Sequence, residues 1–458
     1  MSSIKHLGTL LPLNSLSSES LRTDDYFGMA KLFIDWLHAT GQSIWQMLPL
    51  NPTGFDPQVN YFTSPYWSCG IGINPAYIQF DMQDKIDNLY IDNYTLFASK
   101  NAYWLDGYAV FQCLCEKHAT DDWRRWDPGF HHPDDEKIKH WTLNFARRID
   151  VIKRTQYILH QTFEELKMYA RKMGVEIWGD LPFFLPIGSY HCWRYPNAFV
   201  LTPEYDLEYV AGSLGGRHWR NRQIWGFPLY NFDHPDTFTM WDERMRHTMT
   251  LFDRVRIDSA VRFYEYEMFH VSDTSKDKIM QGPGATYMTH FVNMARELKS
   301  GIYIEDISEF SMKQLEATAH RLGVLGVSVV TLMFSQASDV IDQKDFLLFD
   351  GQPHIYFSST HDTSPLAEYL EGLTPSQQAK LASILTITQT PYTYRDVVMG
   401  LIKHTNIAII AMQDWIGSTT RINVPGIISD TNWNYRMEVP IEKLSKDITT
   451  PPQPSLVA

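Results

Sequence analysis

The chain repeats one arrangement of apolar and polar positions: an amphipathic helix, a glycine and a short apolar strand that ends in polar residues. In one copy the apolar side chains Phe291, Met294 and Leu298 recur at intervals of three and four, the spacing of one helix face. The strand that follows, residues 302–304, is apolar on both sides, as in buried parallel sheets. The glycine between them suits the left-handed residue that closes a helix. The copies occupy residues 29–50, 163–182, 288–308 and 315–334.

Helices that alternate with strands imply a sheet of parallel strands with helices packed on it. Residues 354–362 and 406–414 add two further strand patterns. Six or more such units in 458 residues favour an α/β fold of the (β/α)₈ TIM-barrel type over an open doubly wound sheet. No glycine-rich dinucleotide-binding or phosphate-binding motif follows any of these strands, which counts against a nucleotide-binding fold.

Two regions interrupt the alternation. Residues 81–150 are rich in tryptophan and tyrosine, and we expect them to form a mainly helical inserted subdomain. We expect residues 185–235 to be a long loop excursion at the C-terminal face of the barrel, where long loops usually serve function. The barrel would then consist of residues 1–80 and 151–458.

Composition narrows the class of protein. The 53 acidic residues outnumber the 40 lysines and arginines, and the formal net charge of -13 argues against a nucleic-acid partner. No stretch reaches about 18 apolar residues, and the start of the chain lacks the apolar run of a secretory signal, so we expect a cytoplasmic protein without a membrane span. The 4 cysteines lack metal-site spacing with histidines and are too few to staple a chain of this length, so we expect no metal site.

Acidic residues stand where the expected strands end, which is where the active site of such a barrel lies. They are Asp180, Asp258, Glu305 with Asp306, and Asp362. A ring of carboxylates is typical of acid/base and nucleophilic chemistry at an acetal, such as a glycosidic bond. In a retaining reaction one carboxylate attacks the anomeric carbon, and a second, protonated one about 5 Å away donates to the leaving oxygen.

Arg256 precedes Asp258 by two residues, so both side chains would point to the same side of the strand. The positive charge would hold the aspartate ionised and therefore nucleophilic. A structural ion pair of Arg256 with Asp253 or Glu265 is the alternative. For each acid taken singly, a solvated loop carboxylate or a helix N-cap is the competing interpretation.

Aromatic residues make up 14% of the chain, and many lie in loop segments such as residues 60–67 and 223–232. Flat rings in polar loops can stack on sugar faces. Packing in the core or in the insertion is the alternative for each of them.

Several strand ends belong to longer segments that match one known family in order and over nearly the full chain. The set resembles the 4-α-glucanotransferases, called amylomaltases or disproportionating enzymes, which are relatives of the α-amylases with a (β/α)₈ barrel. The segments are LLPLNSL near the start, WQMLPLNPTGF at 45–55, GDLPFF at 179–184, WGFPLYNFD at 225–233, VRID at 255–258, IEDIS at 304–308, STHDT at 359–363, MQDWIGSTTRINVPG at 412–426 and NWNYRM at 432–437.

The resemblance implies that Asp258 is the nucleophile, Glu305 the general acid/base and Asp362 the residue that stabilises the transition state. A donor glucan would be held on Asp258 as a covalent ester and passed to the 4-hydroxyl of another glucan or glucose. The implied partners are α-1,4-glucans such as maltooligosaccharides and dextrins, and no metal or organic cofactor is implied. The implied substrate contacts are Tyr61, Asp180, Gln223, Trp225, Arg256, His361 and Asn423.

The chain departs from the family pattern where substrate is held. After the nucleophile the family typically continues His-Phe-Arg-Gly-Phe, whereas residues 259–263 are SAVRF. Residues 188–193 are GSYHCW in place of Asp-Ser-Ala-Asp/Glu-Val-Trp, and Phe227 replaces an asparagine. An α-amylase-type glucan hydrolase and a glucan-binding protein with weakened catalysis are therefore the alternatives. The sequence does not give the oligomeric state.

Overall fold

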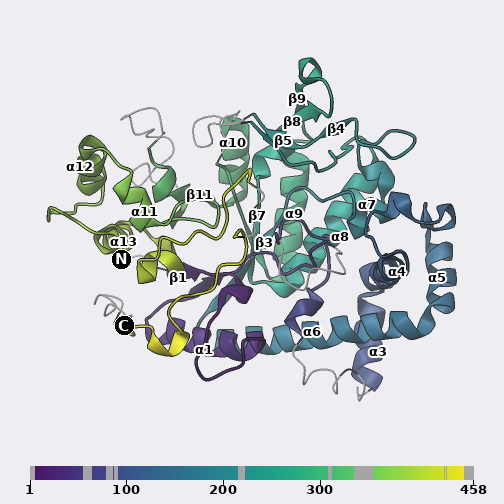
Figure 1. The fold of residues 1–458 in the computed structure, drawn as a ribbon, viewed down its shortest axis with the longest axis horizontal. Helices are drawn as coiled ribbons and strands as arrows, with labels where there is room; N and C mark the ends of the chain where they lie inside the picture. The colour runs from purple at the N-terminus through teal and green to yellow at the C-terminus, as the bar shows by residue number, and fades with distance from the viewer. Residues whose placement is uncertain are drawn as a thin grey trace.

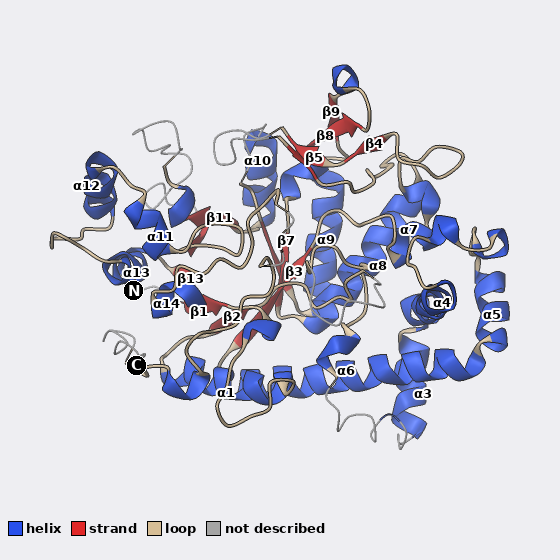
Figure 2. Cartoon of the chain, viewed as in Figure 1, coloured by secondary structure: helices blue, strands red, loops and turns tan. Residues whose placement is uncertain are grey.

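A barrel of eight parallel strands lies at the centre of the protein, with helices around it (Figures 1 and 2). The computed structural model describes residues 6–54, 64–78, 86, 91–214, 222–307, 312–334, 354–427, 429 and 431–447. The barrel strands are β1 (His6–Leu10), β2 (Ile44–Gln46), β3 (Glu176–Leu181), β7 (Arg254–Ile257), β10 (Gly301–Ile304), β11 (Gly326–Val329), β12 (His354–Phe357) and β13 (Ile407–Ala411).

The strands follow one another around the barrel in chain order. The first strand, which the sequence pattern did not reveal, pairs in parallel with the last, so that Gly8 lies opposite Ile409. Between β10 and β11 the Ile304 N–H donates to the Leu325 carbonyl oxygen at 3.0 Å, beside a parallel bridge from Tyr303 to Leu325. These contacts close the ring, and the predicted (β/α)₈ barrel is confirmed.

All four predicted helix–glycine–strand units are present. Two more helices, α8 before β7 and α13 before β13, extend the alternation. The helices that precede barrel strands are α1 (Tyr26–Ala39), α6 (Ala146–Lys172), α8 (Pro235–Leu251), α9 (Ala285–Leu298), α10 (Met312–Leu322) and α13 (Tyr394–His404).

The predicted role of the glycines holds in three of the four units. Gly41, Gly174 and Gly323 are left-handed, with φ of 71°, 73° and 70°. In the fourth unit the prediction is wrong, because Lys299 takes the left-handed conformation, with φ of 56°, and Gly301 is the first residue of β10. A Cβ at Gly301 would lie 2.9 Å from the guanidinium of Arg254 in the neighbouring strand, so this glycine serves close strand packing.

The region between β2 and β3 is helical and has a hydrophobic cluster of its own. Its helices are α3 (Ile91–Lys100), α4 (Ala102–His118), α5 (Asp135–Asn144) and the first part of α6, and the cluster includes Trp104, Trp123 and Trp141. The long helix α6 links this cluster to the barrel, as the lower edge of Figure 1 shows. Since α6 runs without a break through residue 150, the boundaries given for the insertion stay a prediction.

The excursion after β3 packs on the insertion. It begins with the short helix α7 (Tyr190–Arg194), whose Tyr190 and Trp193 are buried in the cluster of the insertion. The Trp193 Nε1–H donates to the Phe130 carbonyl oxygen at 2.8 Å. Farther along, β4 (Tyr209–Val210) joins β8 (Glu265–His270) and β9 (Lys278–Gln281) in a small antiparallel sheet, while β5 (Gly212–Ser213) pairs with β6 (Gln223–Ile224).

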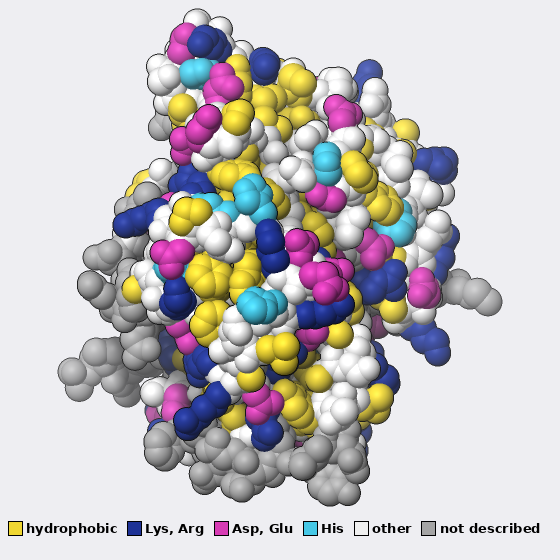
Figure 3. All heavy atoms as spheres, turned by 90° about the vertical axis from the view of Figure 1, so that its right-hand side faces the viewer, with side chains coloured by type: hydrophobic (Ala, Val, Ile, Leu, Met, Phe, Trp, Pro, Cys, Tyr) yellow, Lys and Arg dark blue, Asp and Glu magenta, His cyan; other side chains and the backbone are white. Residues whose placement is uncertain are grey.

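Acidic and basic side chains are interspersed on the face of the insertion that Figure 3 presents, without a continuous basic stripe. None of the helices in the described ranges is both long enough and apolar enough to cross a bilayer.

Candidate active site

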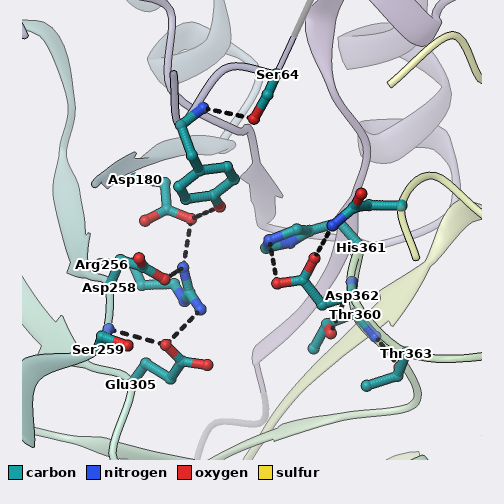
Figure 4. A network of polar contacts seen from close by, with 12 residues as sticks. Ser64, Asp180, Arg256, Asp258, Ser259, Glu305, Thr360, His361, Asp362 and Thr363 are labelled. Carbon is teal, nitrogen blue, oxygen red and sulfur yellow. Dashed lines mark hydrogen bonds and ion pairs between the residues drawn. The ribbon is translucent and has the colours of Figure 1, made fainter. Parts of the chain in front are cut away.

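Strands β3, β7 and β10 bring three acids to one arginine at the C-terminal face of the barrel (Figure 4). The register sets Asp180 opposite Arg256, and Asp258 and Glu305 follow the ends of their strands. The Nη1 atom of Arg256 lies 2.6 Å from Asp180 Oδ2 and 3.0 Å from Asp258 Oδ1. Its Nη2 atom lies 3.1 Å from Glu305 Oε2. One buried guanidinium therefore holds three carboxylates in place.

The alternative pairing of Arg256 does not occur. Asp253, at the amino end of β7, instead pairs with Arg171 at 2.7 Å and accepts the Ile177 N–H at 2.9 Å. Asp306 also stands apart from the cluster, since its buried carboxylate accepts the Val327 N–H of β11 at 2.9 Å. Burial raises the pKa of Asp306 to about 7. We assign Asp306 to the structure of the barrel.

The turn after Asp258 is tied to Glu305. Ser259 has the left-handed φ of 46°, and its N–H donates to Glu305 Oε2 at 2.8 Å. The Ala260 N–H donates to the Glu305 carbonyl oxygen at 3.1 Å. These bonds fix the two acids relative to each other.

A second group of predicted residues lies in the loops after β12 and β13. The Asn423 Nδ2–H donates to Asp362 Oδ1 at 2.6 Å, and the His361 Nε2 atom lies 3.2 Å from Asp362 Oδ2. Burial by itself raises the pKa of Asp362. The neighbouring His361 and the Asn423 amide lower it by more than burial raises it, so that the pKa falls to about 2. Asp362 is therefore a carboxylate throughout the neutral range.

Tyr66 links the two groups, and the sequence analysis missed it. Its hydroxyl donates to Asp180 Oδ2 at 2.7 Å, and its ring stacks on His361 with centroids 5.2 Å apart. The ring of Trp433 packs against Tyr66 at an interplanar angle of 45°, with centroids 5.6 Å apart. The predicted contact Tyr61 lies outside the described residues. The aromatic loop 60–67 was the available signal, but it did not distinguish Tyr66 from its neighbours.

The surroundings of Asp258 favour its protonated form. Burial raises the pKa of Asp258 well above its usual range; Arg256 lowers it only in part, and the charges of Glu305 and Asp180 raise it again. Burial also raises the pKa of Asp180. Our expectation that Arg256 holds Asp258 ionised is therefore wrong, because a single cation does not balance three neighbouring carboxylates, of which Asp180 is fully buried.

Gln223 and Trp225 lie together in the excursion, where the Trp225 Nε1–H donates to Gln223 Oε1 at 2.9 Å. The guanidinium of Arg262 lies 5.6 Å from the Trp225 ring centroid. Arg262 belongs to the 3₁₀ turn that follows Asp258 and forms a buried ion pair with Glu267. Burial lowers its pKa to about 10, which leaves it charged. The altered segment 259–263 thus contributes Arg262, whose guanidinium lies over the Trp225 ring.

We expect Arg262→Met to lower the free energy of unfolding by about 3–5 kcal/mol, because it leaves the buried Glu267 carboxylate without its cation. The double variant Arg262→Met/Glu267→Leu removes both charges and should recover most of this loss. Urea unfolding of the two variants and the wild type measures the difference. Equal stability of the single and double variants would show that the pair has no such role.

The pKa of Asp362 gives a second expectation. It is lower in the folded chain, at about 2, than its ordinary value of 3.8, so ionised Asp362 contributes stability that is complete above about pH 4 and is lost as the pH falls towards about 2. The difference in free energy of unfolding between the wild type and Asp362→Asn should therefore shift against the wild type as the pH is lowered from about 5 to about 3. Urea unfolding at each pH tests this, and a difference that stays constant would contradict the lowered pKa.

The four cysteines, Cys69, Cys113, Cys115 and Cys192, are all free and buried. Within the described part of the chain, no three His, Cys, Asp or Glu side chains are grouped so that they could hold a metal ion.

Comparison with known proteins places this geometry in a family. A sequence model described as 4-alpha-glucanotransferase matches residues 11–90 and 83–442. The 4-alpha-glucanotransferase of Aquifex aeolicus is 25% identical over 94% of this chain and 95% of its own length. The enzyme of the same description from Thermus thermophilus is also 25% identical, over 89% of this chain and 90% of its own.

Solved structures agree on the fold. The amylomaltase from Streptococcus agalactiae, solved in complex with acarbose, superposes with a TM-score of 0.82 at 22% identity and covers 97% of this chain and 99% of its own. The amylomaltase from Corynebacterium glutamicum superposes with a TM-score of 0.73 at 14% identity, over 97% of this chain and 74% of its own.

Proposed function

The chain belongs to the 4-alpha-glucanotransferase family, also called the amylomaltases, and from this we propose the reaction that its carboxylates perform. The enzyme moves an α-1,4-glucan segment from a donor maltooligosaccharide or dextrin to the 4-hydroxyl of another glucan or of glucose. It does so with retention of configuration, by two displacements at the same anomeric carbon.

The close contact of Asp258 and Glu305 on one guanidinium carries this proposal. Inverting enzymes keep their two carboxyl groups about 6.5–9.5 Å apart to admit a water molecule, whereas retaining enzymes keep them at about 5 Å. Here Asp258 lies 3.0 Å from Nη1 of Arg256 and Glu305 lies 3.1 Å from Nη2 of the same guanidinium, which keeps the two carboxyl groups close together. This spacing favours a nucleophile and an acid rather than a water between them.

In the first displacement a carboxylate oxygen of Asp258 attacks the anomeric carbon, while Glu305 gives its proton to the leaving glycosidic oxygen. The shortened glucan departs with a free 4-hydroxyl, and the donor segment stays on Asp258 as a glycosyl ester. In the second displacement Glu305 takes the proton of the acceptor 4-hydroxyl, whose oxygen attacks the anomeric carbon and releases Asp258. The surroundings of Asp258 raise its pKa, and the first displacement requires that Asp258 be ionised when it attacks.

The neighbouring side chains serve the sugar at the cleaved bond. Asp362 is ionised and sits among His361 and Asn423, so its charge can stabilise the positive charge that develops on the sugar ring. Asp180, Arg256 and Tyr66 form the polar wall opposite, where hydroxyl groups find donors and acceptors. Gln223 and Trp225 supply a further platform at the excursion.

An α-glucan is the ligand class that we propose. The acarbose bound by the Streptococcus agalactiae amylomaltase, which shares this fold, supports it. We also propose that the enzyme acts in the cytoplasm, since free buried thiols suit a reducing compartment.

Incubation of the purified protein with maltotriose tests the proposal. Transfer yields glucose, maltopentaose and longer chains at a constant number of reducing ends, because each bond broken is matched by one formed. A rising number of reducing ends would instead identify water as the acceptor and the protein as a hydrolase. Binding of glucan without any change in products would identify a glucan-binding protein.

A further inference from the structure

Trp67, the residue after Tyr66, is part of a second group of aromatic side chains. Trp67 is 41% exposed, and its ring lies 5.0 Å from that of Phe227 in the excursion. Phe227 in turn stacks on Phe184, which lies 6.0 Å from Trp225. The aromatic pair Trp67–Phe227 is thus continuous with the residues around the catalytic acids, but touches none of them.

The backbone under Trp67 is held firmly. The Gly54 N–H donates to the Trp67 carbonyl oxygen at 3.1 Å, and Thr53 and Ser68 form an antiparallel bridge beside it. The indole lies against Gly54, where a Cβ would meet its Cδ1 atom at 3.1 Å. The ring is therefore presented to solvent in a fixed orientation.

A carboxylate from the helical insertion reaches the same place. The Cβ position of Gly54 lies 3.2 Å from Oδ2 of Asp121, which follows α4 in the insertion. A Cβ at Gly188 would lie 2.7 Å from the Cγ atom of Asp121. Because Gly54 and Gly188 have no side chains, the carboxylate of Asp121 fits beside Trp67.

We propose that Trp67, Phe227 and Asp121 form a binding subsite for a distal glucose residue of a maltooligosaccharide, outside the site at Asp258 and Glu305. An aromatic face that is partly exposed suits the apolar face of a pyranose ring, and a carboxylate at its edge accepts hydrogen bonds from the ring hydroxyls. The proposal rests on the proposed function and deepens it, because it makes the insertion part of the glucan-binding surface. A longer glucan can occupy the site at Asp258 and this subsite at the same time, whereas the shorter maltotriose occupies both less well.

Three variants test the subsite: Phe227→Asn, Asp121→Asn and Trp67→Ala. We measure kcat/KM for maltoheptaose and for maltotriose and compare their ratio. One lost stacking contact corresponds to about tenfold in affinity, so the ratio should fall by about tenfold in the aromatic variants and less in Asp121→Asn. Phe238→Ala is the matched control, since this exposed ring of α8 packs on Tyr287 and His290 instead of on Trp67 or Phe227, and should keep the wild-type ratio.

Direct binding separates this proposal from the proposed function. Calorimetry with maltoheptaose in an Asp258→Asn background reports affinity without turnover, so it tests the subsite even if the wild type transfers nothing. A loss of affinity of about tenfold in Phe227→Asn, but not in Phe238→Ala, supports the subsite. The subsite would be ruled out if the folded Trp67, Phe227 and Asp121 variants bound maltoheptaose with wild-type affinity and kept the wild-type ratio of kcat/KM for maltoheptaose and maltotriose. Gly188→Ala gives an independent check, because its methyl group displaces the Asp121 carboxylate and should act in the same direction as Asp121→Asn.

Discussion

Asp258→Asn should lower kcat/KM for glucan transfer by about 10⁴-fold, the scale of loss when a covalent nucleophile is removed. The amide is nearly the same size as the carboxylate and can keep a contact to Arg256 through its oxygen, so the variant should fold. It cannot form the glycosyl ester, because a neutral amide oxygen is a poor nucleophile. Product analysis with maltotriose measures the loss.

A matched control lies at the other end of the same strand. Asp253 precedes β7, pairs with Arg171 and touches none of the catalytic acids, so Asp253→Asn should retain activity within about twofold. A circular dichroism spectrum establishes that each variant is folded. Transfer at wild-type rates by folded Asp258→Asn would show that another carboxylate is the nucleophile.

The candidate acids were predictable because the fold gathers them by a simple rule. Parallel strands end at one face of the barrel, so acids at the ends of separate strands come to the same face, whatever their distance along the chain. The pairing of Arg256 with Asp258 follows from a spacing of two residues in one strand. The register of neighbouring strands then adds Asp180 opposite Arg256, a contact that spacing alone did not specify.

Contacts made by loops were not predictable in the same way. Tyr66 reaches Asp180 and His361 from a loop after β2, and no periodicity relates these positions. Local pattern also failed to tell Glu305 from Asp306, two neighbouring acids of which the second binds the backbone of β11 instead. The raised pKa of Asp258 depends first on burial, which a single sequence does not give.

The structure shows which residues lie next to the positions that differ from the family pattern. Gly188 and Phe227 are 39 residues apart in the chain. Gly188 leaves room for the Asp121 side chain, and Phe227 packs on Trp67, so both substitutions affect the proposed subsite. Arg262, in the altered turn after Asp258, lies over the ring of Trp225. The departures therefore lie around Asp258 and Glu305 and do not replace either acid.

Glu305→Gln should lower kcat/KM with maltotriose by about 10³-fold, because no acid remains to protonate the leaving oxygen. The glutamine side-chain oxygen can still accept the Ser259 N–H, so the turn after Asp258 is preserved. With α-maltosyl fluoride the first displacement should stay fast, since fluoride leaves without a proton. The second displacement lacks its base, so the glycosyl ester should accumulate, and mass spectrometry of the intact protein and its peptides should find the sugar on Asp258.

Glu305→Gln should also change the pKa of Asp258. Contact with Glu305 raises the pKa of Asp258, so its replacement by a neutral amide should lower that pKa and leave Asp258 ionised at more acidic pH. The acidic limb of the pH profile with α-maltosyl fluoride should therefore move to lower pH in Glu305→Gln. If maltotriose and the fluoride lose activity to the same extent and this limb does not move, Glu305 is not the general acid, and the retaining pair must be sought between Asp258 and another carboxyl group.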